Sequence, residues 1–183
     1  MKKEIQKAPA FGINKEFDLA YQKYRANPNG KLKPKDEFYT HWLKVKHMEE
    51  LLTPEYTQFE NRPKEAMKHL MKVKKGQCTK AFYRSGIGYI DIVWGEVTDP
   101  VAHTGLGLAH IIDKHGAEIA QLGFKVEDFV AIIIQFADFK ESDNGDEILF
   151  ESKRFRIIVE KTYNGRSKHW ILSAFDLRKK PQK

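Results

Sequence analysis

The chain has one cysteine among its 183 residues, Cys78. A single cysteine cannot form a disulfide within a monomer, nor can it supply a cysteine-rich zinc site. No catalytic signature surrounds it, so we interpret Cys78 as an incidental thiol. Disulfide-stapled folds and cysteine-based zinc modules are therefore excluded for the monomer.

Long apolar runs are also missing. The longest runs from Phe129 to Ile134, far short of the roughly 20 residues that span a bilayer. The N-terminus, MKKEIQKAPAFGINKEF, has no apolar core of signal-peptide length. We expect a soluble protein with no membrane partner that acts in the bacterial cytoplasm. Delivery by a phage or a toxin system would leave no trace in this sequence.

Positive charge is in excess, with 32 Lys and Arg against 25 Asp and Glu and a formal net charge of +7. Such an excess attracts polyanions, although many basic domains bind no nucleic acid. Hydrophobic residues make up 41% of the chain, enough for one buried core with an appendage. Charge alone is therefore only a weak indication of a nucleic-acid partner.

Residues 1–61 are expected to form an N-terminal helical extension. Glu16–Arg25 and Lys35–Leu52 have apolar residues at near-helical spacing, and turn residues at 27–30 separate them. We leave the role of this extension open. One hypothesis is that it binds a partner such as an immunity protein or a carrier protein.

Residues 62–178 are expected to form the main domain, followed by a basic tail at 179–183. Asn61 and Pro63 predict a helix start, and Gly76 its end. The further expected elements are a strand at Gly88–Trp94, a helix from Gly105 to near Gly116, a helix at Val126–Phe139, and strands at Glu147–Phe150, Arg154–Tyr163 and Ser167–Leu177. This order predicts an α+β fold with N-terminal helices followed by a small antiparallel β-sheet.

Asn164-Gly165 predicts a tight hairpin between the last two strands, because a type I′ turn needs two residues with positive φ. The expected register pairs Tyr163 with Arg166, Val159 with Trp170, and Arg156 with Ser173. One face then forms the core and carries Phe155, Ile157, Val159, Trp170, Leu172 and Ala174. The other face carries Arg154, Arg156, Ile158, Glu160, His169, Ile171, Ser173 and Phe175.

This second face has two interpretations. Arginine offers a fixed fork of donors that suits phosphate oxygens, so the face could be a phosphate-binding floor. Alternatively it is an ordinary solvated surface. A slip of one residue would exchange the two faces.

The segment from Gly105 to Gly116 holds a cluster of histidines and lysine. His110 and Lys114 are four apart and share a helix face, whereas His115 need not point the same way. Taken alone the cluster is more typical of a surface or capping feature, and it lacks the HExxH pattern of zinc enzymes. Cleavage of RNA without a metal needs proton-transfer groups and cations, which histidine, lysine and arginine provide. Paired carboxylates for two metals are missing, so we expect no metal and no cofactor.

Several ordered motifs resemble a known family. They are RPKEAM at 62–67, QCTKAFYR at 77–84, GIGYIDIVWG at 86–95, GLGLAHIIDKH at 105–115 and WILSAF at 170–175. Together they resemble the phage-type barnase–EndoU–colicin–RelE (BECR) nuclease domains over about 115 residues. The resemblance implies helices followed by a four- or five-stranded antiparallel sheet, with the active site on the open face of the sheet.

The resemblance also implies site residues. His110 would be the leading general acid or base, with His115 as the alternative. Arg154 and Arg156 would hold phosphate, Ser173 would donate to a phosphate oxygen or orient the substrate, and Lys114 would help electrostatically. Residues 96–104 are longer than the family pattern leads us to expect, and we interpret His103 there as a loop residue.

The resulting hypothesis is a metal-independent endoribonuclease of phage, mobile-element or toxin origin. It would cleave RNA, with tRNA as one candidate, and leave a cyclic phosphate. The alternative is a non-catalytic module on the same scaffold that binds nucleic acid or protein. An assay of the purified protein on RNA would discriminate between the two.

Overall fold

The structure is a computed structural model that describes residues 15–26, 34–163 and 166–177. The chain divides into two compact units, Met1–Met48 and Glu49–Lys183. The boundary expected between residues 61 and 62, and the separate basic tail, stay predictions. No helix in the described residues is both long and apolar enough to cross a membrane.

The first unit contains the two expected helices, α1 (Lys15–Ala26) and α2 (Lys35–Leu51), the second of which runs on into the other unit. Phe17 is 2% exposed and is the buried centre of this unit. The rings of Tyr21, Phe38, Tyr39 and Trp42 lie 4.9 to 6.1 Å from its ring. Aromatic packing of this kind holds the two helices together.

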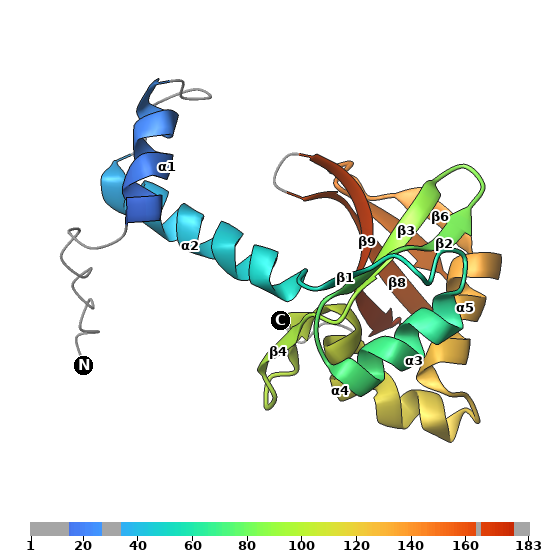
Figure 1. The fold of residues 1–183 in the computed structure, drawn as a ribbon. Coiled ribbons are helices and arrows are strands. Elements are labelled where there is room, and N and C mark those ends of the chain that lie inside the picture. Colours follow the sequence, from blue (N-terminus) through green and yellow to red (C-terminus); the bar gives the residue numbers. More distant parts are fainter. Residues whose placement is uncertain (1–14, 27–33, 164–165, 178–183) are drawn as a thin grey trace. The chain divides into compact units, whose positions relative to one another are not determined.

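The second unit is built on a seven-stranded sheet with the order β1-β2-β3-β9-β8-β7-β6 (Figure 1). Its strands are β1 (Glu55–Tyr56), β2 (Gln77–Arg84), β3 (Gly88–Val93), β6 (Asp138–Glu141), β7 (Glu147–Glu151), β8 (Phe155–Tyr163) and β9 (Arg166–Asp176). The β1–β2 and β3–β9 pairs are parallel, and the others are antiparallel. The sheet is therefore mixed, whereas the sequence predicted a purely antiparallel one. A separate hairpin, β4 (Glu96–Asp99) and β5 (Thr104–Leu106), leads into α4.

Three helices, α3 (Pro63–Val73), α4 (Gly107–Gln121) and α5 (Val126–Phe136), pack on one face of this sheet. Their apolar side chains form a single buried cluster with Ile157 and Val159 of β8. The opposite face of β8 carries Arg156, Ile158 and Glu160, which are all partly exposed. We call this second side the outer face of the sheet. The arrangement confirms the predicted α+β class.

The last hairpin keeps the predicted register only near its turn, which itself lies outside the described residues. Tyr163 pairs with Arg166, as expected. Two register shifts then move β9 along β8, so the predicted pairs Val159–Trp170 and Arg156–Ser173 are wrong. The observed partners are Val159 with Ile171, Glu160 with Trp170, Ile158 with Ser173 and Arg156 with Phe175.

These shifts change which residues of β9 face the core. Ile171, predicted on the polar face, takes the core position beside Val159, and the predicted core residue Trp170 lies opposite Glu160 on the outer face. Two shifts restore the original alternation, because each one exchanges the faces. Ala174 therefore still faces the core, and Ser173 still faces outward.

Helix α4 differs from its predicted bounds at both ends. Gly105 belongs to β5, and the helix begins at Gly107. Gly107 has φ of +75°, and a Cβ there would lie 2.8 Å from the carbonyl oxygens of both Val93 and Trp94. Only glycine therefore lets the helix start so close to the end of β3. Gly116 does not end the helix, because burial of Ile119 one turn later offsets the cost of a mid-helix glycine, about 1 kcal/mol.

Three other elements differ from expectation. Arg62, rather than Asn61, occupies the cap position of α3, and no side chain caps this helix. Helix α5 ends at Phe136, and β6 follows in place of its predicted last turn. Strand β2 and the β4–β5 hairpin were not predicted. The β2–β3 and β4–β5 pairs each contain an irregular register, which breaks the regular alternation that marks a strand in a sequence.

Candidate active site

A pocket of about 320 Å³ lies between the start of α4, the β4–β5 hairpin and the outer face of the sheet. It is lined by His103, Thr104, Gly105, His110, Lys114, Glu147, Ile158 and Ser173. Ile158 and Ser173 are direct partners on β8 and β9, and His110 and Lys114 lie on successive turns of α4. Three of the predicted site residues, His110, Lys114 and Ser173, thus share one pocket.

His110 is the more buried histidine of this pocket. The residue is 4% exposed, and its Nδ1 has no hydrogen-bond partner among the described residues. Burial, and after it the positive charge of Lys114, lowers the pKa of His110 below its ordinary value, and Asp113 opposes this shift. The imidazole is therefore neutral near pH 7, which is the form that accepts a proton.

His103 is the second histidine of the pocket, and a carboxylate holds it. Its Nδ1 lies 2.7 Å from Oδ2 of Asp113 on α4, while the side chain stays 51% exposed. Such a contact fixes the orientation of the ring. His103 was predicted only as a loop residue, and its contact with Asp113 was not predicted.

The β4–β5 hairpin has internal contacts that set the position of His103. Oδ1 of Asp99 accepts the backbone N–H groups of Val101 and Ala102 at 2.8 and 2.9 Å. These two bonds also lower the pKa of Asp99. The hydroxyls of Thr98 and Thr104 lie 2.9 Å apart across the hairpin. Residues 96–104, expected as a long link, are thus an ordered hairpin that ends at the pocket.

Cationic, hydroxyl and carboxylate groups complete the pocket. Lys114 brings an ammonium group from α4, and Ser173 a hydroxyl from β9. Glu147 brings a carboxylate from β7, where it pairs directly with Glu160 of β8. Burial, and after it the charges of Glu147 and Asp146, raises the pKa of Glu160. The pocket therefore combines the Lys114 ammonium from α4 with the Glu147 carboxylate from β7.

His115 does not line the pocket. It is 2% exposed, and its Nε2 lies 2.8 Å from the backbone oxygen of Ala174. Its Nδ1 lies 3.1 Å from Oε2 of Glu118. Both ring nitrogens therefore have partners, and the contact joins α4 to β9. This geometry supports a structural role for His115, and the predicted catalytic role has no support from it.

Replacing His115 with leucine should destabilise the protein by about 1–3 kcal/mol, because the buried oxygen of Ala174 loses its 2.8 Å partner and keeps only the Ser173 hydroxyl at 3.5 Å among the described side-chain donors. His115→Gln should lose less stability, since the glutamine amide can still donate to the oxygen of Ala174. Thermal unfolding of both variants, beside an exposed control, His41→Gln, would measure the effect. A His115→Leu protein that melts like the wild type but does not cleave RNA would contradict the structural role.

The two predicted phosphate-binding arginines have carboxylate partners. Arg154 Nε lies 3.2 Å from Oδ2 of Asp176, and its guanidinium lies 4.9 Å from the ring centroid of Phe155. Arg156 Nε donates to Oε1 of Glu151 at 2.8 Å. Neither arginine lines the pocket that holds His110. Their phosphate-binding role stays a prediction that this geometry does not support.

Two further observations bear on the chemistry of the protein. Cys78 is buried, and burial raises the pKa of its thiol to about 12, in keeping with an unreactive side chain. Among residues 15–26, 34–163 and 166–177, no group of three or more His, Cys, Asp or Glu side chains is arranged to hold a metal ion.

Comparison with known proteins agrees with this architecture. A family model described as phage-Barnase-EndoU-ColicinE5/D-RelE like nuclease 1 matches residues 81–181. The match covers more than half of the chain and includes every residue that lines the pocket. No curated protein and no solved structure matches the chain. The chain therefore belongs to the phage-Barnase-EndoU-ColicinE5/D-RelE like nuclease 1 family.

Proposed function

We propose that the protein is a metal-independent endoribonuclease that leaves a 2′,3′-cyclic phosphate. The observation that carries this proposal is the pairing of two unlike histidines in one pocket. His110 is buried and neutral, whereas His103 is exposed and held by Asp113. Groups whose environments differ in this way can divide the roles of base and acid.

In the proposed reaction, neutral His110 removes the proton of a ribose 2′-hydroxyl. The 2′-oxygen attacks the adjacent phosphorus, and the bond from phosphorus to the 5′-oxygen breaks. Protonated His103 donates its proton to that leaving oxygen. The products are a 2′,3′-cyclic phosphate and a free 5′-hydroxyl, and a second proton exchange returns the histidines to their starting forms.

Lys114 and Ser173 would stabilise the phosphate during this reaction. An ammonium and a hydroxyl can both donate to oxygens on which negative charge builds. Glu147 would repel a phosphate placed near β7, so the substrate is expected nearer to α4. The proposed partner is single-stranded or looped RNA, with tRNA as one candidate substrate.

The direct test is to incubate the purified full-length protein with tRNA and total RNA in EDTA and to map the new ends. We expect cleavage that leaves cyclic phosphate and 5′-hydroxyl ends. Binding without cleavage, with affinity falling steeply as salt rises, would instead favour the non-catalytic alternative. Activity that appears only when a divalent metal is restored would overturn metal independence.

The proposal also predicts a pH dependence. Since neutral His110 is the base, kcat/KM should rise with pH through the lowered pKa of His110, so this rising limb should lie at a lower pH than an ordinary histidine would give. Lys114→Gln removes a charge that opposes protonation of His110, so this rising limb should move to higher pH. The control Lys72→Gln, on the exposed side of α3, should leave the limb in place. If the rising limb of the kcat/KM profile stayed at the same pH in Lys114→Gln, His110 would not be the base.

A further inference from the structure

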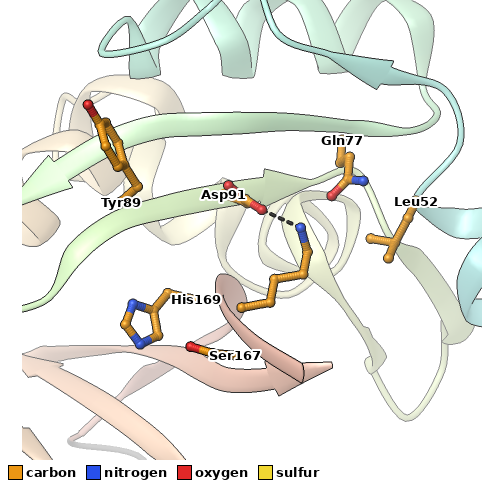
Figure 2. A pocket seen from close by; sticks show the side chains of 7 residues that line it. Leu52, Gln77, Tyr89, Asp91, Ser167 and His169 are labelled. Atoms are coloured by element: carbon orange, nitrogen blue, oxygen red, sulfur yellow. Dashed lines mark hydrogen bonds and ion pairs between the residues drawn. The ribbon is translucent and has the colours of Figure 1, made fainter. Parts of the chain in front are cut away.

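A second pocket, of about 500 Å³, lies on the outer face of the sheet and shares no lining residue with the pocket that holds His110 and His103 (Figure 2). It is lined by Leu52, Gln77, Tyr89, Asp91, Ser167, Lys168 and His169. It lies between β3 and β9, which pair at Asp91 and Trp170. In Figure 2, Tyr89, Asp91 and Gln77 lie on one side of it and Ser167 and His169 on the other.

Gln77 carries a buried acceptor without a donor. The residue is 7% exposed, and its Oε1 has no hydrogen-bond partner among the described residues. Buried polar atoms are nearly always paired, so an orphan acceptor on a pocket wall needs an explanation. A ligand that donates an N–H group into the pocket would provide one.

Asp91 is a second acceptor on the same wall. The residue is 9% exposed, and its Oδ1 accepts the backbone N–H of Lys80 at 2.7 Å. Its Oδ2 forms an ion pair with Lys168. A carboxylate has about four acceptor sites, so these two contacts leave capacity for a ligand. Asp91 also supports the irregular stretch of β2 at Lys80, which makes it a poor residue to mutate.

Tyr89 adds an aromatic surface. Its side chain is 40% exposed, and Tyr83 meets it edge-on with ring centroids 5.3 Å apart. Lys80 Nζ lies 5.2 Å from the ring centroid, which adds positive charge beside the aromatic group. Exposed aromatic rings next to cations are the usual platforms for unstacked bases of single-stranded nucleic acid.

We propose that this pocket binds two adjacent nucleotides of the RNA substrate, one base donating N–H groups to Gln77 and Asp91 and the next base stacking on Tyr89. Tyr89 lies four residues, about 13 Å, from Val93, the β3 partner of Gln77, so one base does not reach both. The inference rests on the proposed function.

Strand β9 links the two sites, because Ser173 lines the histidine pocket and Lys168 lines this one. Ser167 of this pocket pairs with Thr162 of β8, and Ser173 of the histidine pocket pairs with Ile158, four positions away, so the two sites lie about 13 Å apart along the sheet. The bound bases would therefore lie a few nucleotides from the cleaved bond.

The acceptors also predict which base fits best. Oε1 of Gln77 and the carboxylate of Asp91 together suit an edge that presents two adjacent N–H donors. Guanine has such an edge in its ring N–H and its amine, whereas adenine, cytosine and uracil each present one donor group. We therefore expect guanine to bind most tightly.

The test is a titration of the full-length protein in EDTA with GMP, AMP, CMP, UMP and ribose 5-phosphate, monitored by NMR or calorimetry. GMP should bind best, and ribose 5-phosphate should not bind. Gln77→Met should weaken GMP binding about tenfold. Tyr89→Leu, at an exposed position, should weaken by a similar factor the binding of a 2′-deoxy guanosine dinucleotide, which has no 2′-hydroxyl and is not cleaved. The control Gln121→Met lies exposed on α4 and should bind GMP like the wild type.

Each other outcome overturns the proposal. Ribose 5-phosphate binding as tightly as GMP would indicate a phosphate site, and no nucleotide binding would indicate another kind of ligand, such as a protein partner. An unchanged dissociation constant in both folded variants would also refute it. Because GMP has no internucleotide bond that the enzyme could cleave, the binding result does not depend on catalysis. A protein that binds GMP but cleaves no RNA would refute the proposed function alone.

Discussion

Replacing His110 with alanine is expected to slow RNA cleavage by about two to four orders of magnitude, the usual loss when a positioned proton-transfer group is removed. The fold should survive, because Nδ1 of His110 has no hydrogen-bond partner in the described residues that the change would orphan. Single-turnover cleavage of a labelled RNA in EDTA would measure the loss, and circular dichroism would check the fold.

Two controls separate a catalytic role from a structural one. His41→Ala, at an exposed position on α2, should cleave at the wild-type rate. Added imidazole should restore part of the activity of His110→Ala, since the vacated pocket wall can admit a free base. A His110→Ala protein with more than a third of the wild-type rate would remove His110 from the mechanism.

The fold was largely predictable because most of its elements follow local patterns. The spacing of apolar residues predicted α1, α2, α3 and α5, and the alternation beside Asn164-Gly165 predicted the last hairpin. The register of that hairpin was not predictable beyond Thr162, which still pairs with Ser167 as expected. Each bulge adds one residue to β9, and no turn residue or glycine in the sequence marks where it occurs.

The site was predictable only in part. Some of its residues belong to sequence motifs, whereas others are positioned by contacts that form only in the folded chain. His110, Lys114 and Ser173 come from recognisable motifs, and they share one pocket. Arg154 and Arg156 were expected to face a substrate, but they pair with the carboxylates of Asp176 and Glu151, which the sequence pattern did not place beside them. His103 lies ten residues before Asp113 in the sequence, and their contact depends on the folded hairpin. The one available signal was the turn chemistry of Asp99-Pro100.

Replacing His103 with alanine is expected to slow cleavage of ordinary RNA by about two to four orders of magnitude, because the leaving 5′-oxygen then lacks a proton donor. Asp113→Asn should cause a smaller loss, since it removes only the group that orients the ring. Combining the two changes should add little to His103→Ala alone, because residues that act as a unit are not additive. Rates of the three variants on one RNA would test this.

The leaving group distinguishes the acid from the base. A uridine 3′-phosphate ester of 4-nitrophenol has a leaving group that departs without protonation, so His103→Ala should cleave it at nearly the wild-type rate. His110→Ala should remain slow on the same ester, because the 2′-hydroxyl still has to lose its proton. If both variants were equally impaired on the activated ester, His103 would not be the acid. If His110→Ala alone cleaved the ester at nearly the wild-type rate, the roles would be reversed, with His110 as the acid and His103 as the base.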